Sequence, residues 1–171
     1  MRRFFPVLAL LLAVSGAIIA CGGADNSGST TSGGSSSSSS SAAHFKVGDQ
    51  VKVGDTWVVT LNSVTTHGST DIDQLNAGDT YLVLDMTFKN VSSQEQSLSS
   101  LLQLSLKDST GQSYNETVTS FAKATPDGKV EAGGLSRGQL VFEVPSSQKS
   151  FTLAFEADIT SGGQTIWDIK L

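Results

Sequence analysis

The sequence predicts an all-β domain, an antiparallel β-sandwich of seven or eight strands. Two observations lead to this prediction. Apolar and polar residues alternate along most segments after residue 44, and clusters of Gly, Pro, Asn and Asp interrupt them about every ten to fifteen residues. No segment shows a convincing helical period. The chain of 171 residues has one cysteine, Cys21, so the sandwich is expected to have no disulfide.

The N-terminus is predicted to be a lipoprotein signal peptide covering residues 1–20. A pair of arginines precedes an apolar stretch at 7–19, whose length of about 13 residues falls short of the roughly 20 that cross a bilayer. Residues 18–21, IIAC, follow the lipobox pattern of an aliphatic residue, a spacer, a small residue and cysteine. This pattern predicts cleavage before Cys21 and lipid, including palmitate, on its sulfur. Plain secretion after cleavage at another small residue is the alternative.

Residues 21–43 are predicted to be the lipidated cysteine followed by a disordered Ser/Gly tether. The tether contains an unbroken serine run at 35–41 and no large apolar residue, so it has nothing to bury that would offset its ordering entropy. A flexible chain of this kind has an r.m.s. span of about 25 Å. The folded domain, residues 44–171, is therefore expected close above the membrane and outside the cytoplasm.

The first two strands of the domain are expected at residues 50–53 and 56–64, joined by a tight turn at 54–55. Trp57 shares its face with aliphatic residues, which places it in the core. Val64 falls out of phase with that face, and a β-bulge near Asn62 and Ser63 would correct the phase.

The later strands each show one apolar and one polar face. They are expected at residues 81–89, 102–107, 140–144, 151–156 and 166–171. In the second of these, Leu102, Leu104 and Leu106 lie on the core face, and Trp167 is a core residue of the last. Residues 115–134 show little alternation, which predicts a long crossover with at most one helical turn.

Three stretches, GDTYLVLDMTFKN, SLLQLSLKDSTGQSY and LSRGQLVFEVP, resemble a bacterial domain family of unknown function found in lipoproteins and membrane-anchored extracellular proteins. The resemblance covers roughly residues 48–171 and implies an immunoglobulin-like fold. This family is similar to a small secreted mycobacterial immunogenic antigen of that fold. Because the family has no established activity, the resemblance implies no catalytic or ligand-binding residue.

The charge of the chain argues against a nucleic-acid partner. Eleven Lys and Arg residues oppose sixteen Asp and Glu residues, for a formal net charge of −5. The basic residues of the domain are scattered singly from Lys46 to Lys170, whereas phosphate binding needs a basic stripe.

The sequence predicts no enzyme and no cofactor. Of the two histidines, His44 lies at the edge of the tether, so a Ser-His-Asp site would depend on His67. His67 stands in a loop-like run of turn-forming residues without a nucleophile elbow, and a solvated loop histidine is the favoured interpretation. One lipidated cysteine and two histidines are too few for a zinc or copper site.

Two sets of residues are candidates for binding. Asp71, Asp73 and Asp79 gather in one loop and carry oxygen ligands suited to calcium, although the spacing departs from an EF-hand and a solvated loop is favoured. Tyr81 and Tyr114 flank strand ends and are candidates for exposed contacts.

Together these features predict a non-catalytic binding or interaction module, anchored by lipid to the bacterial cell membrane. Its partner would be an envelope protein, a peptide or a glycan, reached through loop ends or an edge strand. The alternative is a calcium-binding or enzymatic domain centred on the Asp71–Asp79 loop. A contiguous apolar or aromatic patch on the folded surface would favour the interaction module.

Overall fold

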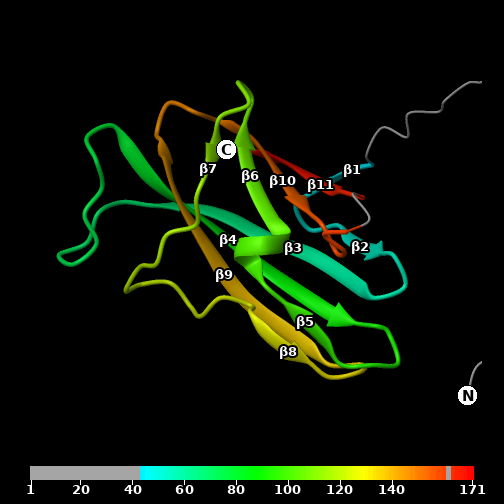
Figure 1. Cartoon of the computed structure of the whole chain (residues 1–171). Coiled ribbons are helices and arrows are strands. Elements are labelled where there is room, and N and C mark those ends of the chain that lie inside the picture. Colours follow the sequence, from blue (N-terminus) through cyan, green and yellow to red (C-terminus); the bar gives the residue numbers. More distant parts are fainter. Residues whose placement is uncertain (1–42, 161–162) are drawn as a thin grey trace, which may run out of the picture. The chain divides into compact units, whose positions relative to one another are not determined.

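The computed structural model describes residues 43–160 and 163–171, which form a β-sandwich (Figure 1). The predicted all-β sandwich is therefore confirmed. The signal peptide and the tether, predicted for residues 1–20 and 21–43, lie outside the described residues except for the last tether position. No helix in the described ranges has the length and apolar character needed to span a bilayer.

Two larger sheets face each other. The first contains, in spatial order, β1 (His44–Lys46), β11 (Thr165–Lys170), β10 (Ser150–Phe155), β6 (Leu104–Asp108) and β7 (Ser113–Tyr114). The second contains β2 (Gln50–Val53), β3 (Trp57–His67), β4 (Asp79–Asn90) and β9 (Leu135–Pro145). A separate antiparallel pair consists of β5 (Gln96–Leu98) and β8 (Gly128–Val130).

The described residues contain eleven strands where the sequence predicts seven or eight. The additional strands are short: β1, β5 and β8 have three residues each and β7 has two. Strands of this length are too short to show an alternating pattern, and only their pairing with longer strands defines them.

The pairing of β1 with β11 is parallel, whereas every other strand pairing in the described ranges is antiparallel. Two side-chain contacts accompany this pairing. The ring of Phe45 packs on Trp167 with centroids 6.1 Å apart, and His44 Nδ1 lies 2.9 Å from Asp168 Oδ1. The N-terminal strand is thus attached to the edge of the sandwich by backbone, apolar and polar contacts together.

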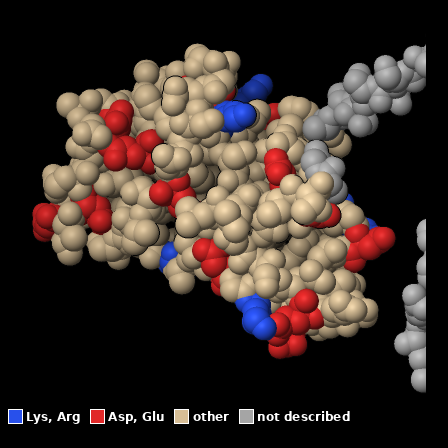
Figure 2. Space-filling model, in the orientation of Figure 1, with Lys and Arg blue, Asp and Glu red and all other residues tan. Residues whose placement is uncertain are grey.

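Charged side chains are spread thinly over the face of the domain seen in Figure 2. Lysine and arginine form isolated spots there, and acidic side chains stand around a middle region without charge. This face has no basic stripe, consistent with the scattered basic residues in the sequence.

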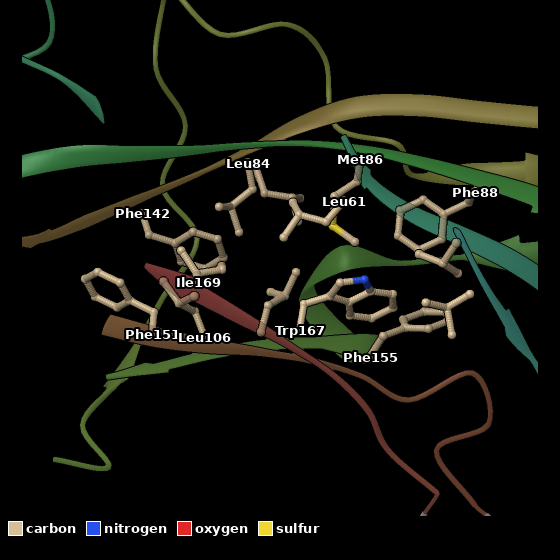
Figure 3. Packing of buried hydrophobic residues seen from close by; sticks show 14 of the residues in the cluster. Leu61, Leu84, Met86, Phe88, Leu106, Phe142, Phe151, Phe155, Trp167 and Ile169 are labelled. Carbon is tan, nitrogen blue, oxygen red and sulfur yellow. The ribbon is translucent and has the colours of Figure 1, made fainter. Parts of the chain in front are cut away.

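The core lies between the two larger sheets, where alternate apolar side chains of each long strand meet (Figure 3). The inward residues of β4 are all fully buried: Leu82, Leu84, Met86 and Phe88. The facing sheet contributes Leu106, Leu153, Phe155, Trp167 and Ile169, also fully buried or nearly so. Full burial of one such side chain stabilises the fold by about 1.5–3 kcal/mol.

Phe88 joins the two sheets at one end of this core. Its ring meets Trp57 edge-on at 6.2 Å and Phe155 of the opposite sheet at 5.3 Å. Trp57 is 1% exposed and Trp167 is 0% exposed, so the core placement predicted for both tryptophans is confirmed.

The predicted bulge is present in β3, where the pairing with β4 shifts register between Leu61 and Ser63. The extra residue, Asn62, lies on the outer face and donates through Nδ2 to Asp85 Oδ1 at 2.7 Å. After the bulge, Val64 pairs with Leu84 and packs against the core, as its sequence phase requires.

The helical turn is at α1 (Ser100–Gln103), outside the predicted crossover. The sequence-based prediction of a strand beginning at residue 102 is wrong by two residues for this reason. Gln103 N donates to Ser99 O at 3.0 Å, and the carboxylate of Asp127 accepts from Ser100 N at 2.6 Å. Because Asp127 comes from a distant part of the chain, local sequence patterns cannot reveal the contact that supports this turn.

The predicted crossover is confirmed as a long connection, in which β8 is the one named strand among the described residues 115–134. It runs along the outer edge of β9. Thr117 N donates to Val141 O at 2.8 Å, and Gln139 N donates to Ala124 O at 3.1 Å. The edge of β9 is therefore covered by the chain's own backbone.

Gly138 makes the close approach of this crossover possible. A Cβ atom at residue 138 would lie 2.4 Å from both Ala124 O and Pro126 N. Real Cβ atoms do not approach backbone atoms this closely, so any larger residue would have to displace the crossover.

We expect Gly138→Ala to lower the free energy of unfolding by about 1–3 kcal/mol, as overpacking of a well-packed site does. Urea denaturation followed by circular dichroism measures this change. Gly68→Ala is the matched control, because a Cβ there meets no atom within 4 Å. Equal stability of the two variants would contradict the proposed role of Gly138.

Candidate functional site

The helical turn α1 presents two neighbouring leucines to solvent. Leu101 is 75% exposed and Leu102 is 70% exposed, and Ile159 beyond the end of β10 is 59% exposed. In Figure 2 the middle of the face that carries α1 is mostly uncharged. We call these three residues, with the two hollows beside them, the α1 surface. Exposed apolar residues that gather in this way mark interaction sites more often than isolated ones do.

The larger hollow, on the Leu102 side of α1, has a volume of about 480 Å³. Leu102, Ala157 and Ile159 give it apolar walls, and polar side chains including Gln96 line the rest. Gln103 fixes its wall, because Nε2 donates to Ala157 O at 3.1 Å and Oε1 accepts from the Ser99 backbone at 2.9 Å. This volume lies in the range of small-ligand and side-chain pockets.

The smaller hollow, on the Leu101 side, has a volume of about 260 Å³ and is called here the Glu116 slot. Its apolar lining includes Leu101, Leu104 and Phe142, and Tyr114 also lines it. Burial raises the pKa of the Glu116 carboxyl, while a hydrogen bond with the Ser100 side chain acts in the opposite direction. The slot therefore combines apolar walls with one half-buried acid.

Ser100 links this acid to a second one. The Ser100 side chain is 2% exposed, and its hydroxyl lies 3.1 Å from Asp127 Oδ2. The charge of Asp127 also raises the pKa of Glu116. Two carboxyl groups thus share one buried serine at the base of α1.

Tyr114 is half-buried at the slot and is held in place by Asp108. Its hydroxyl donates to Asp108 Oδ2 at 2.8 Å, and its ring meets Phe151 edge-on at 6.0 Å. Burial first, and then the Asp108 carboxylate, raise the pKa of Tyr114 to about 12. The predicted role of Tyr114 as an exposed contact stays a prediction, now for a fixed ring at the edge of a hollow.

The Asp108 carboxylate accepts several hydrogen bonds from the turn that follows it. Oδ1 accepts from Thr110 Oγ1 at 2.7 Å, Thr110 N at 2.8 Å and Gln112 N at 3.0 Å. These bonds, that of the Thr110 hydroxyl foremost, hold the pKa of Asp108 at about 2 despite its burial. The strong shift has a structural cause, since Asp108 closes the turn between β6 and β7.

The prediction that Tyr81 is an exposed contact is wrong. Tyr81 is 4% exposed, and its hydroxyl donates to Gln74 O at 3.2 Å. Its ring packs with Phe121 of the crossover at 5.4 Å, in a second apolar cluster that also contains Val83 and Val141. Alternation correctly places Tyr81 on the outer face of β4, but it cannot show that distant loops cover that face.

Asp73 joins the loop before β4 to the crossover. Its Oδ2 accepts from Ser120 N at 2.9 Å and from Ser120 Oγ at 2.6 Å, and Thr70 Oγ1 lies 3.3 Å away. The Ser120 hydroxyl is the main reason that the pKa of Asp73 is lowered. The carboxylate is therefore used in holding two loops together.

Asp71 is exposed, and Asp79 begins β4 with its backbone N–H donating to Asn76 O at 3.1 Å. Across residues 43–160 and 163–171, no three His, Cys, Asp or Glu side chains are placed to hold a metal ion together. The structure does not assemble the three aspartates into one site, and calcium binding stays a prediction.

His67 lies at the end of β3, where the sequence predicts a loop. Its ring stacks on Phe121 with centroids 4.1 Å apart, and its Nδ1 lies 2.7 Å from Gly68 O. His67 and Tyr81 therefore both pack on Phe121, and Asp73 accepts hydrogen bonds from the neighbouring Ser120. Cys21 lies outside the described residues.

Of the residues that form the α1 surface, only Tyr114 is a candidate binding residue predicted from the sequence. The prediction that Leu102 lies on the core face of a strand is wrong, because α1 turns this side chain outward. One signal was present: Leu101 and Leu102 are adjacent, and strict alternation has no place for two consecutive core leucines. Glu116 and Asp127 carry no comparable local signal.

The described fold agrees with the family to which the chain is similar. Residues 45–166 match the domain of unknown function DUF4352. The chain belongs to this family. No curated protein matches the sequence.

Several solved structures share the fold of this DUF4352 protein. The secreted protein MPT63 from Mycobacterium tuberculosis is 13% identical, with a TM-score of 0.53 over 78% of this chain and 100% of that one. The yjhA protein from Bacillus subtilis is 19% identical, with a TM-score of 0.56 over 73% and 98% of the two chains. The predicted lipoprotein ycdA, also from Bacillus subtilis, is 15% identical, with a TM-score of 0.57 over 70% of this chain and only 38% of ycdA.

At these identities the similarity concerns the fold alone. It confirms the β-sandwich fold that the family resemblance implied. The family has no assigned activity.

We expect Tyr114 to ionise at a pH of about 12 in a Tyr81→Phe variant, where it is the only remaining tyrosine. Since its pKa is raised, the stability that neutral Tyr114 contributes is complete below its ordinary value of 10.0 and is lost as the pH rises through about 12. Phenolate ultraviolet absorbance gives the midpoint.

Adding Asp108→Asn should lower that midpoint while leaving it above 10.0, because burial is the larger cause of the shift. Circular dichroism at each pH reports whether the fold is intact. A midpoint that Asp108→Asn does not change would show that the carboxylate has no part in the shift.

Proposed function

We propose that this DUF4352 protein is a lipid-anchored, extracytoplasmic interaction module that binds an envelope partner through the α1 surface. The observation that supports it is the exposure of Leu101, Leu102 and Ile159 beside two hollows. Solvent exposure of large apolar side chains costs free energy, and a partner that covers them recovers it.

The shape of the α1 surface suits a protein or peptide partner. It combines large apolar side chains with polar ones such as Gln96 and Ser105. Protein–protein contacts commonly combine apolar groups with polar side chains in this way. The surface also lies on a structured turn, since Asp127 and Gln103 hold α1 from both sides.

A non-catalytic role is consistent with the titratable groups of the domain. The two largest pKa shifts belong to Asp108 and Tyr114, whose side chains share a hydrogen bond. Each shift is explained by a turn or by burial, so neither identifies a reacting group. Nucleic acid is an unsuitable partner for a surface with so few basic residues.

The extracytoplasmic location rests on the lipobox at Cys21 and on the relatives of the fold. MPT63 is described as secreted and ycdA as a predicted lipoprotein. A tethered domain samples a small volume above the membrane, which raises the effective concentration of any neighbouring membrane partner.

We expect Cys21→Ser to abolish lipid attachment, because serine lacks the sulfur that carries the lipid. In cells grown with radiolabelled palmitate, the wild-type chain should be labelled and found with membranes. The variant should lose the label and remain uncleaved at residue 21. An unlabelled wild-type chain in the medium would favour plain secretion over anchoring.

We expect a photo-crosslinking amino acid at residue 102 to give discrete adducts in intact cells of the source bacterium. The same amino acid at residue 52, an exposed position on β2 outside both hollows, is the matched control. Leu101→Ser should reduce the adducts at residue 102 by about tenfold, since burying one leucine is worth more than 1.4 kcal/mol. Equal adduct patterns from both positions would contradict a role for the α1 surface.

A further inference from the structure

The edge of the first sheet is incomplete where it borders the Glu116 slot. Strand β6 pairs with β7 only through Leu106 and Lys107. On the opposite side, the whole of β6, including Leu104 and Ser105, pairs with β10. Within the described sheet, Leu104 and Ser105 thus have a strand on one side only, and both line the slot. Leu104 N–H donates to Ser100 O, so this end of β6 offers room for a partner's side chain and not a free backbone donor.

The slot has a negative charge without a basic partner. The ion pairs between lysine or arginine and acidic side chains in the described ranges are Lys52–Asp55, Lys129–Glu95 and Arg137–Asp85. None of them includes Glu116 or Asp127. A half-buried carboxylate loses part of its hydration, and a cationic group that reaches it restores a favourable charge interaction.

The walls of the slot suit the stem of a long basic side chain. Leu101, Leu106 and Phe142 are apolar, and Glu116 lies among them. Lysine and arginine bury their methylene groups along apolar surface while the charged end reaches a polar group. A purely apolar side chain would cover the carboxylate without pairing it, which is unfavourable. An acidic side chain would be repelled by Glu116.

From these observations we infer that the α1 surface binds a peptide segment of a protein partner, which passes the end of β6 at Leu104 and Ser105 and places a lysine or arginine side chain in the Glu116 slot. The inference rests on the proposed function and specifies the chemistry of its partner. The exposed Leu101 at the slot contacts an apolar residue of the same segment.

A displayed library of random octapeptides, selected on the full mature chain in detergent, tests this inference. We expect the selected peptides to carry lysine or arginine at one position next to apolar residues. Against Glu116→Gln, which keeps the shape of the side chain, the basic preference should disappear. Replacing the basic residue of a selected peptide by norleucine should weaken its binding to the wild-type chain by about tenfold, or about 1.4 kcal/mol.

Two controls separate the inference from the proposed function. Glu131→Gln changes an exposed carboxyl outside the slot and should leave the selection unchanged. Leu101→Ser should reduce binding of every selected peptide, and thermal unfolding of each variant shows that it is folded.

Peptides that require Leu101 but have no basic preference would overturn the inference and keep the proposed function. Peptides that require neither Leu101 nor Glu116, or an absence of any selected peptide, would overturn both.

Discussion

Phe88 lies between the two sheets, with Trp57 beside it and Phe155 opposite, and the sandwich depends on this layer of rings. The layer requires that β3, β4 and β10 each keep one apolar face toward the centre. The bulge at Asn62 is a consequence of that requirement, because it returns Val64 to the inner face after a break in phase. Once the two sheets are packed, the ends of their strands determine where every connecting segment lies.

The candidate site forms where two such segments meet. The segment between β5 and β6 turns through α1, and the crossover supplies Asp127, which binds the first residue of the turn. Ser100 is buried at this contact, and the next two residues, both leucines, face solvent. The exposure of Leu101 and Leu102 is therefore built into the way the crossover holds α1.

The strands and the core were largely predictable from the sequence, and the site was not. A period of two is a local property, and it identified β3, β4, β9, β10 and β11, together with the tryptophans and the bulge. The failures involve contacts between distant segments. Tyr81 has the pattern of an outward residue, but the crossover covers it with Phe121. Leu102 has the spacing of a core residue, but a carboxylate from residue 127 favours the helical turn that contains it.

The aspartate loop shows the same limit of local sequence patterns. Three carboxylates close in sequence suggest a shared ligand, because sequence shows only their proximity. The hydrogen-bond partner of Asp73, Ser120, lies on the crossover, and no local pattern connects them. Glu116 shows the converse case, since a single glutamate in an irregular segment gives no signal until burial and the open end of β6 surround it.

The parallel pairing of β1 with β11 has a mechanical consequence. A pull directed along β1 from its N-terminal end loads the pairs His44–Ile166, Phe45–Trp167 and Lys46–Asp168 at the same time, in shear. The contacts of Phe45 with Trp167 and of His44 with Asp168 resist the same displacement. A strand that separates in shear must break its contacts together, whereas one peeled from its end loses them one after another. The β1–β11 pairing is thereby suited to bearing tension between the proposed membrane anchor and the proposed partner.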